Sequence, residues 1–398
     1  MLEKYENKIR FCSGNQPNAQ PGYSMFGRRD FVRGVVATTT AAVPLVPQGA
    51  MAPLPPTTHT TNPRELTLPL RFDRRGGSYV LDWELNGRAF SGILDTASPF
   101  LTVSGSCGEL DPRWGCLPGK FESEERKERR AFDPTYEVYG LQEDGLTDWL
   151  SSEVVLRGEG DASYRVSDVV FGASEGVGAK GGTAPAPMFG LVREVAEGIR
   201  PSFLSQTDFD GFTVDFDESR LRLGAPNPPD AQQREGTTIP LVDLRPLGAP
   251  AFEYASRVDR LVVNGYDVTM WLDRPCYCVF DTGTTGMLVS RRLWDSTLFE
   301  IGVQQCAMEL PTVGGENVVL AASTRSCRND CLLVSTPIDV EWRPPESEIG
   351  PGGPPQFDVI FVGLAFLRSR GYMSVDLNSS TMTIGPYRDL SRAARNEA

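Results

Sequence analysis

Two segments of the sequence pair an aspartate with small and hydroxyl-bearing residues: residues 93–98 read ILDTAS and residues 279–284 read VFDTGT. Each aspartate ends an apolar run and enters a turn, where a hydroxyl three positions on can hydrogen-bond the carboxylate. Two such carboxyls placed together cannot both ionise easily, so they share a proton. The ionised member can deprotonate a water that attacks a carbonyl carbon, while the protonated member donates to the carbonyl oxygen. The predicted chemistry is hydrolysis by Asp95 and Asp281 with no cofactor and no metal.

The composition argues against other routes to hydrolysis. The single histidine, His59, lies in a Pro- and Thr-rich stretch with neither a strand nor a helix pattern. Serine–histidine, cysteine–histidine and all-histidine zinc sites each need an imidazole in a cleft, so the sequence disfavours these classes. The formal net charge of -13 makes nucleic acids and anionic membranes poor partners.

The aspartate segments belong to an internal repeat, and duplication of this kind places them around a pseudo-twofold axis. Each copy has a turn with Asn-Gly, the aspartate segment, an apolar segment with Gly, and a β-hairpin pattern. In the two copies these blocks lie at 85–87 and 263–265, 93–98 and 279–284, 188–191 and 361–364, and 212–224 and 373–385.

The repeat predicts an all-β chain of two lobes, each contributing one aspartate loop. The expected N-terminal lobe is 66–235 and the expected C-terminal lobe is 236–398, after a linker at 53–65. Helical periodicity is scarce. We expect it only at 191–198, around 291–294 and in the charged run 122–130, which is most simply a solvated surface insertion.

The paired aspartate segments and the repeated blocks resemble the two-lobed, pepsin-like aspartic proteases of eukaryotes. The resemblance covers about Leu66 to Pro386 and includes the apolar segments through Gly190 and Gly363, which that family threads beside each catalytic loop. It implies an all-β, two-lobed pepsin-like acid protease fold with pseudo-twofold symmetry and a few short helices.

The resemblance also implies a role for each residue of the two motifs. The catalytic carboxyls would be Asp95 and Asp281. Ser98 and Thr284 would support them by hydrogen bonding. Thr96 and Thr282 would form a buried hydroxyl network between the loops. The flap over the substrate would carry Tyr139-Gly140, with Tyr136 as a weaker candidate. For either tyrosine the alternative is a half-exposed strand residue.

The first motif departs from the family pattern. Ala97 stands where the motif normally has glycine, so a methyl group in a crowded turn is expected to displace Asp95. Thr102 occupies the region where many relatives have a tryptophan that packs on the flap, and Pro99-Phe100 is unusual there. These departures put flap closure in doubt.

The N-terminal segment 1–52 is read as a targeting signal. Arg28-Arg29 precedes an apolar stretch at 35–46 and then Ala50-Met51-Ala52, an order that resembles a twin-arginine export signal. Export would lead to the thylakoid lumen, or to the bacterial periplasm or exterior. The alternative is a solvated arginine pair before a tail. The apolar stretch is too short to span a membrane.

The cysteines agree with export. Cys107 and Cys116 bracket a short loop and make a plausible disulfide. Removal of Cys12 with the signal would leave an odd number, so at least one thiol would be unpaired or would pair with another chain. The pairing of the others cannot be deduced, and metal binding by them is a weaker alternative: Cys276, Cys278, Cys306, Cys327 and Cys331.

Three functions follow, in order of preference. The first is an exported, monomeric aspartic endopeptidase that cuts an extended peptide or unfolded protein, with an acid-side pH optimum. The second is a pepsin-like scaffold that binds a peptide or protein without cutting it, a reading motivated by Ala97 and the missing tryptophan. The third, a two-carboxylate glycosidase, leaves the paired motifs and duplicated hairpins unexplained.

Overall fold

The computed structural model describes residues 64–387, apart from 108–111, 119–123, 140–142, 176–185, 225–235, 297–298, 300, 325–332, 341 and 343–356. Two compact units make up the chain, residues 1–55 and 56–398, and every described residue belongs to the second. The predicted signal at 1–52 lies outside the described residues. Among those described, no helix combines the length and apolar character needed to cross a membrane.

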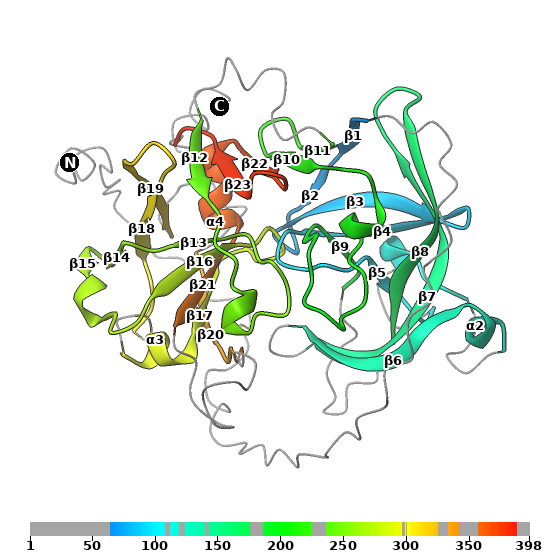
Figure 1. Cartoon of the computed structure of the whole chain (residues 1–398), viewed down its shortest axis with the longest axis horizontal. Helices are drawn as coiled ribbons and strands as arrows, with labels where there is room; N and C mark the ends of the chain where they lie inside the picture. The colour runs from blue at the N-terminus through cyan, green and yellow to red at the C-terminus, as the bar shows by residue number, and fades with distance from the viewer. Residues whose placement is uncertain are drawn as a thin grey trace, which may run out of the picture. The chain divides into compact units, whose positions relative to one another are not determined.

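The first half of the described chain forms an eight-stranded sheet (Figure 1). Its main path runs β5-β8-β7-β3-β4-β9, while β2 pairs with β3 and β6 pairs with β7. The β4–β9 and β5–β8 pairs are parallel and the others are antiparallel. The strands are β2 Arg71–Asp73, β3 Ser78–Leu85, β4 Arg88–Asp95, β5 Thr102–Ser104, β6 Arg130–Tyr139, β7 Glu143–Arg157, β8 Ser163–Glu175 and β9 Met188–Gly190.

The second half forms a five-stranded sheet of order β13-β16-β21-β17-β20 and a four-stranded sheet of order β15-β14-β18-β19. In the five-stranded sheet β16 runs parallel to β21, as β4 runs parallel to β9 in the first half. The strands are β13 Ala255–Arg257, β14 Arg260–Val263, β15 Tyr266–Asp267, β16 Cys276–Phe280, β17 Met287–Ser290, β18 Gln305–Pro311, β19 Asn317–Ser323, β20 Ser335–Ile338 and β21 Asp358–Val362.

A six-stranded sheet joins the two halves and contains both predicted hairpins. Its order is β1-β11-β10-β22-β23-β12, and the antiparallel β10–β22 pair connects one copy of the repeat to the other. The hairpin predictions at 212–224 and 373–385 are confirmed by β10–β11 and β22–β23. The strands are β1 Leu66–Pro69, β10 Gly211–Asp215, β11 Arg220–Leu223, β12 Thr237–Pro240, β22 Tyr372–Asp376 and β23 Thr381–Ile384.

The Asn-Gly turns have the backbone that their sequence predicts. Asn86 and Gly87 have φ of 49° and 76°, and Asn264 and Gly265 have φ of 52° and 85°. Positive φ at both central residues matches the twist of a two-residue hairpin, and Asn-Gly tolerates it better than other pairs. These turns set the register of β3 with β4 and of β14 with β15, and β4 leads directly to Asp95.

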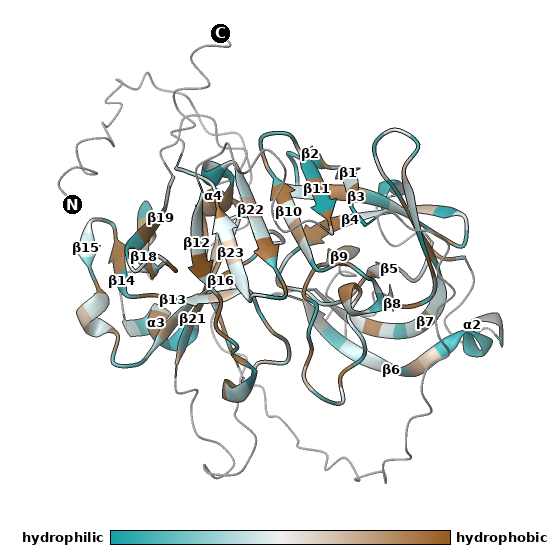
Figure 2. Cartoon of the chain, turned by 45° about the horizontal axis from the view of Figure 1, so that its top comes forward, coloured by the Kyte–Doolittle hydropathy of each residue, from teal (hydrophilic) through white to brown (hydrophobic). Residues whose placement is uncertain are grey.

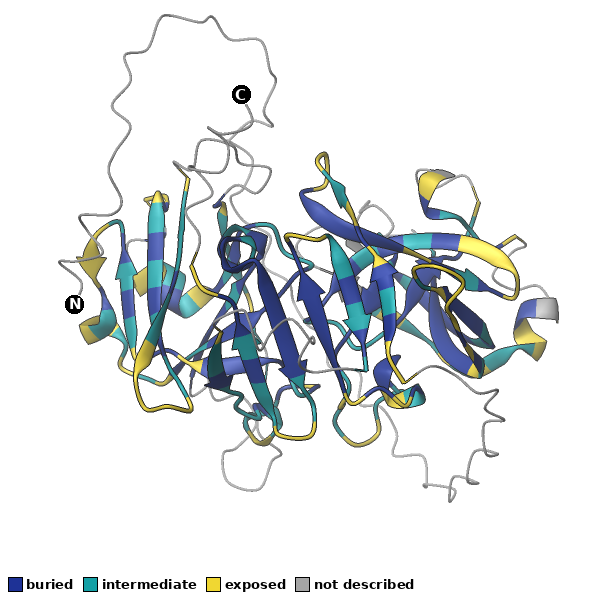
Figure 3. Ribbon diagram, turned by 90° about the horizontal axis from the view of Figure 1, so that it is seen from above, coloured by how far each residue is buried: buried dark blue, intermediate teal, exposed yellow. Residues whose placement is uncertain are grey.

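The core lies between the sheets and is rich in aromatic side chains. Its largest buried members include Trp83, Trp149 and Tyr254, each no more than 2% exposed. Apolar residues colour much of the central strands in Figure 2. In Figure 3 the same strands are dark blue, and exposed residues gather in the turns. This burial of apolar area is the main stabilising contribution to the fold and holds the strands that carry the aspartates.

Helices are short. They are α2 Glu124–Glu128, α3 Arg291–Ser296 and α4 Leu364–Leu367, with 3-10 turns η1 Pro112–Trp114, η2 Leu204–Gln206, η4 Arg245–Leu247, η5 Thr269–Trp271 and η6 Arg368–Arg370. The prediction of a helix around 291–294 is confirmed by α3. The prediction at 191–198 is wrong, because Leu191 and Val195 make bridging contacts with Asp95 and Ala251 in place of helical hydrogen bonds.

The charged run 122–130 differs from its prediction in one respect. It contains α2, but Arg126 in that helix is only 4% exposed. Its guanidinium forms an ion pair of 2.8 Å with Glu175 and also donates to the carbonyl of Gly105. A buried guanidinium needs such partners to offset the loss of hydration. The reading of the whole run as a solvated insertion is therefore wrong for Arg126, which anchors α2 to β8.

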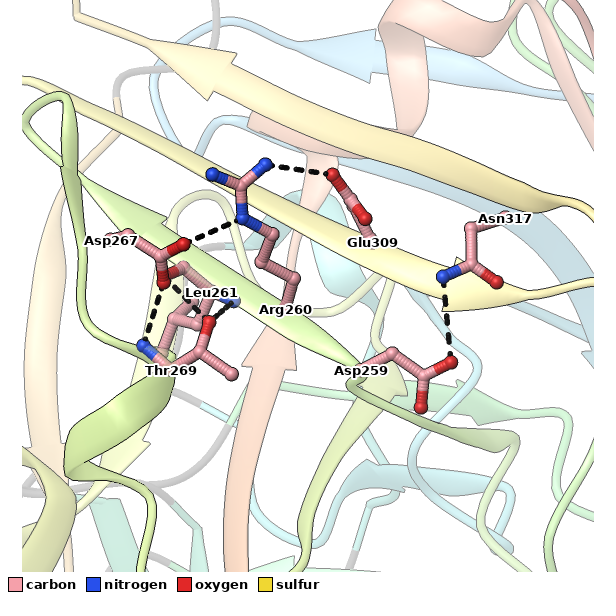
Figure 4. A network of polar contacts seen from close by, with 7 residues as sticks. All are labelled: Asp259, Arg260, Leu261, Asp267, Thr269, Glu309 and Asn317. Carbon is pink, nitrogen blue, oxygen red and sulfur yellow. Dashed lines mark hydrogen bonds and ion pairs between the residues drawn. The ribbon is translucent and has the colours of Figure 1, made fainter. Parts of the chain in front are cut away.

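Arg260 ties three strands of the four-stranded sheet together (Figure 4). From β14 its Nε lies 2.7 Å from Asp267 in β15, and its Nη1 lies 3.1 Å from Glu309 in β18. Exposed ion pairs of this kind contribute up to about 1 kcal/mol each. They hold β14, β15 and β18 of this sheet together.

The predicted disulfide is present between Cys107 and Cys116, whose Cα atoms lie 5.1 Å apart. Cys276, Cys278 and Cys306 are buried free thiols. Burial raises the pKa of Cys306 to about 12, so this thiol stays protonated. Cys12, Cys327 and Cys331 lie outside the described residues.

Candidate active site

Each aspartate stands at the end of a strand beside a parallel neighbour. Asp95 is the last residue of β4, and its carbonyl accepts from the N–H of Leu191, 2.9 Å away, just after β9. Asp281 directly follows β16, and its N–H donates to the carbonyl of Val362 in β21 at 3.0 Å. The two copies of the repeat therefore hold their aspartates in the same way.

A glycine at the end of each parallel neighbour, Gly190 in β9 and Gly363 just after β21, allows a close approach of backbone. A methyl group on Gly190 would lie 2.5 Å from the carbonyl oxygen of Ser98, and one on Gly363 would lie 2.0 Å from that of Thr284. Both distances are far inside van der Waals contact. The segments at 188–191 and 361–364 thus pack directly against the turns that contain the aspartates, and only glycine fits there.

A reciprocal pair of buried hydroxyls links the two turns. The Oγ1 of Thr96 donates to the carbonyl of Phe280 at 2.7 Å and accepts from the N–H of Thr282 at 3.0 Å. The Oγ1 of Thr282 donates to the carbonyl of Leu94 at 2.8 Å and accepts from the N–H of Thr96 at 3.1 Å. Both threonines are 0% exposed, so all four bonds are shielded from water.

The carboxyl of Asp281 has a complete set of donors. Its Oδ1 accepts from the N–H of Gly283 at 2.8 Å and of Thr284 at 3.1 Å, and its Oδ2 accepts from the hydroxyl of Thr284 at 2.6 Å. The Oδ1 of Asp95 accepts from the N–H of Ala97 at 2.8 Å. The Oγ of Ser98 lies 3.6 Å from the Sδ of Met188, to which it donates.

The carboxyls of Asp95 and Asp281 are both buried, and each affects the pKa of the other. Burial, followed by repulsion from Asp95, raises the pKa of Asp281 to about 8. Burial also raises the pKa of Asp95, against hydrogen bonds from Ala97 and Ser98 that lower it. A pair in this environment can hold one proton between its carboxyls well above the pH at which a solvated aspartate loses its own.

The two motifs differ at their third residue. Ala97 is partly buried, and its side chain packs against a small apolar cluster that includes Val279 and Val359. A methyl group on Gly283 would instead lie 2.7 Å from the Cγ of Asp95. The expected displacement of Asp95 by Ala97 is absent from the hydrogen bonding, because the Ala97 N–H reaches Asp95 at the same 2.8 Å as the Gly283 N–H reaches Asp281.

This asymmetry predicts unequal effects of two single-methyl changes. Gly283→Ala should displace the carboxyl of Asp95 and lower any hydrolytic activity by on the order of 100-fold. Ala97→Gly should only remove a methyl from an apolar cluster, at a cost of about 1 kcal/mol. Rates and thermal unfolding of both variants provide the check. Equal losses of activity in the two variants would contradict the asymmetry between positions 97 and 283.

The predicted flap is only partly visible. Tyr139 is the last residue of β6, and Gly140 lies outside the described residues. Tyr136 is 47% exposed. The hydroxyl of Thr102 accepts from the N–H of Met188 at 2.9 Å, so this residue joins β5 to β9.

Sequence reasoning missed an aromatic contact between the β6–β7 hairpin and the segment after the first motif. The rings of Phe100 and Trp149 lie 4.9 Å apart edge to face, and Arg200 lies over both. The Nε1 of Trp149, in β7, donates to Thr135 in β6 at 2.7 Å. A tryptophan therefore packs near the segment that follows the first motif, although it lies in β7 and not in the region of Thr102.

Sequence reasoning also missed Glu253. Its side chain is 4% exposed, and repulsion from both Asp95 and Asp281 acts on its carboxyl. The available signal was a single acidic residue inside the otherwise apolar run Ala251-Phe252-Glu253-Tyr254-Ala255. An isolated charge in such a run is costly to bury and is therefore a candidate functional group.

Comparison with known proteins gives structural relatives alone. No protein-family model matches the sequence, and no curated protein matches it. The structure of basic 7S globulin from soybean matches with a TM-score of 0.51 at 12% identity, over 82% of this chain and 96% of that one. The structure described as edgp matches with a TM-score of 0.52 at 14% identity, over 84% of this chain and 98% of that one.

Both structures are pepsin-like. Sequence identities of 12% and 14% show a common fold and do not establish a common activity. The observed sheets, the parallel strands beside each aspartate and the paired hairpins agree with the likeness. The prediction of an all-β architecture is confirmed: the chain has the two-lobed, pepsin-like fold.

Proposed function

We propose that this protein is an aspartic endopeptidase in which Asp95 and Asp281 activate a water for attack on a peptide bond. The observation that carries the proposal is the pair of buried carboxyls, both with raised pKa values, on two turns that the Thr96 and Thr282 hydroxyls link directly. A carboxyl that is solvated or paired with a cation is ionised at neutral pH. A shared proton is what general acid and general base catalysis by two identical groups requires.

In the proposed mechanism one carboxyl of the pair is ionised and the other is protonated. The ionised member accepts a proton from water as the water oxygen bonds to the peptide carbon, and the protonated member donates to the carbonyl oxygen. Transfer of a proton to the nitrogen then breaks the carbon–nitrogen bond, which gives an acid and an amine. The hydroxyl network of Thr96 and Thr282 holds the two turns so that the carboxyls keep their mutual geometry.

Cleavage of casein by the full chain over pH 3 to 9 tests this proposal. We expect a bell-shaped profile whose alkaline limb falls near pH 8, because the pKa of Asp281 is about 8 and the pair loses its proton there. A peptide analogue with a hydroxyl at the scissile position should inhibit, since it mimics the tetrahedral species. An optimum confined to alkaline pH, or cleavage indifferent to the analogue, would contradict the carboxyl mechanism.

The second candidate is a scaffold that binds a peptide without cutting it. One observation favours it: Ala97 replaces the glycine of the first motif. A folded protein that binds the analogue but cleaves nothing at any pH would support this reading over the endopeptidase.

The setting of the protein follows from the same features. The Cys107–Cys116 disulfide fits a protein exported to an oxidising compartment. Export by a twin-arginine route to the thylakoid lumen, or to the bacterial periplasm or exterior, stays a prediction from residues 1–52. We propose a peptide or an unfolded protein as substrate, handled by a monomer.

A further inference from the structure

Strand register places Glu253 beside the aspartate pair. In the antiparallel β13–β16 ladder Ala255 lies opposite Val279, and the N–H of Phe280 donates to the carbonyl of Tyr254 at 3.0 Å. Continued past the end of the ladder, this register would bring Glu253 opposite Asp281. Residues directly opposite each other in such a ladder project their side chains to the same face. Glu253 and Asp281 therefore share a face at the end of β16.

The backbone around Glu253 is fixed. Its N–H donates to the carbonyl of Ala251 at 2.9 Å, and the N–H of Phe252 donates to the carbonyl of Glu194 at 2.8 Å. The phenol of Tyr254 donates to the carbonyl of Leu191 at 2.5 Å, which ties this segment to the residue that follows β9. The carboxyl of Glu253 is thus held in place between the segments that position the two aspartates.

The side chain of Glu253 has no compensating partner in the described part of the chain. It is 4% exposed, its Oε2 has no hydrogen-bond partner, and no described basic side chain forms an ion pair with it. Burying a carboxyl without a partner is costly in free energy.

The charges that face Glu253 are negative. Burial and then repulsion from Asp95 and Asp281 hold the pKa of Glu253 well above its usual range. The neighbouring Tyr254 is neutral, because burial raises its pKa. Three carboxyls therefore converge where the described chain supplies no cation. A positively charged group on a ligand would complement the negative charge of these carboxyls.

We propose that Glu253 is a specificity-determining residue whose free Oε2 receives the ammonium or guanidinium group of a Lys or Arg side chain next to the scissile bond. This inference rests on the proposed endopeptidase function and names its substrate class as peptides with a basic residue beside the bond that is cut. The incoming cation offsets the repulsion from the aspartates. Glu253 then ionises, releases its proton to solvent and forms a charge-assisted hydrogen bond with the ligand.

A matched pair of peptides tests the assignment. The two share one sequence and carry either lysine or norleucine at a single position within two residues of the cleaved bond. A second pair replaces that bond by a hydroxyethylene group, so that binding is measured without cleavage. With the full chain, we expect lysine to be preferred by about 10-fold or more in kcat/KM and in binding, as for a hydrogen bond to a buried charge.

Two variants locate the source of that preference. Glu253→Gln keeps the size of the side chain and removes its charge, and we expect the lysine-to-norleucine ratio to fall to about one. Glu194→Gln is the matched control, because it removes a charge from the same region at an exposed carboxyl that pairs with Arg245. This control should keep the ratio. Thermal unfolding of each variant verifies that it is folded.

Proton release gives an independent readout that a merely structural role would not change. Calorimetry of the lysine analogue in buffers of different ionisation enthalpy should show about one proton released by the wild type, and less by Glu253→Gln. A neutral hydrogen-bond donor that satisfied Oε2 would bind without this release. Equal release by the wild type and Glu253→Gln would overturn the assignment.

The outcomes separate this inference from the proposed function. Cleavage with equal rates for both peptides overturns the role of Glu253 and leaves the endopeptidase intact. Selective binding of the lysine analogue without cleavage supports the role of Glu253 and contradicts the endopeptidase. Folded protein that neither cleaves nor binds any of the four peptides overturns both.

Discussion

Asp281→Asn is expected to lower peptide-bond cleavage by on the order of 10³-fold or more and, at the same time, to stabilise the folded protein at neutral pH. The loss follows because an amide can neither accept the proton of water nor share one with Asp95. The gain follows because the wild type must hold a buried carboxyl next to another. Burial raises the pKa of Asp281 to about 8, so the fold disfavours its charged form.

The sign of the pH dependence follows from the raised pKa. In the unfolded chain Asp281 loses its proton near its ordinary pKa of 3.8, whereas in the folded protein it keeps that proton up to about pH 8. Its contribution to stability is therefore complete below the unfolded pKa and is lost as pH rises through the folded pKa. Between about pH 5 and pH 7 this one group should lower the free energy of unfolding by roughly 1.4 kcal/mol per pH unit.

Urea unfolding of the wild type and Asp281→Asn at several pH values between 5 and 8, beside casein cleavage, measures both effects. Asp215→Asn is the control, because Asp215 is 3% exposed and accepts from backbone N–H groups of its own hairpin. It should leave cleavage in place. An Asp281→Asn protein that still cleaves, or that is less stable than the wild type at pH 8, would contradict the shared-proton pair.

Thr96→Val is expected to destabilise the fold by about 2–6 kcal/mol, a large effect for a change that keeps the shape of the side chain. The hydroxyl of Thr96 serves two buried groups, the N–H of Thr282 and the carbonyl of Phe280. Valine leaves both without a partner. Because these bonds join the two turns, the aspartates should also lose their mutual position, and cleavage should fall.

Denaturant unfolding of Thr96→Val, Thr282→Val and the double variant gives the coupling between the two hydroxyls. The single losses should add to more than the loss in the double variant, because either change loosens the two linked turns and so weakens the bonds that the other hydroxyl makes. Thr238→Val is the comparison, because the hydroxyl of Thr238 makes one half-buried bond to Thr383 at 3.1 Å. A Thr96→Val loss no larger than that of Thr238→Val would contradict a bracing role.

The fold alone leaves the activity open. Soybean basic 7S globulin and edgp share the architecture at 12% and 14% identity, and a common fold hosts more than one function. What distinguishes this chain is chemical: a buried carboxyl pair, a methyl at 97 that packs against an apolar cluster, and a third buried carboxyl at 253.

Much of the architecture was accessible from sequence because local patterns specify it. Asn86-Gly87 and Asn264-Gly265 require hairpin turns, and alternating residues in 212–224 and 373–385 require paired strands. The duplicated order of the blocks predicted two similar halves. The motif residues were also identifiable, since a hydroxyl three residues after an aspartate reads directly as a carboxylate partner, as Thr284 serves Asp281.

Other features depend on tertiary contacts between segments distant in sequence. The burial of Arg126, the irregular course of 191–198 and the packing of Trp149 on Phe100 follow from neighbours that no local pattern encodes. The same is true of Ala97, whose methyl finds room in a cluster from the other half of the chain. Glu253 is the clearest case, because a carboxyl becomes costly to ionise only when the fold removes its water and places two more carboxyls beside it.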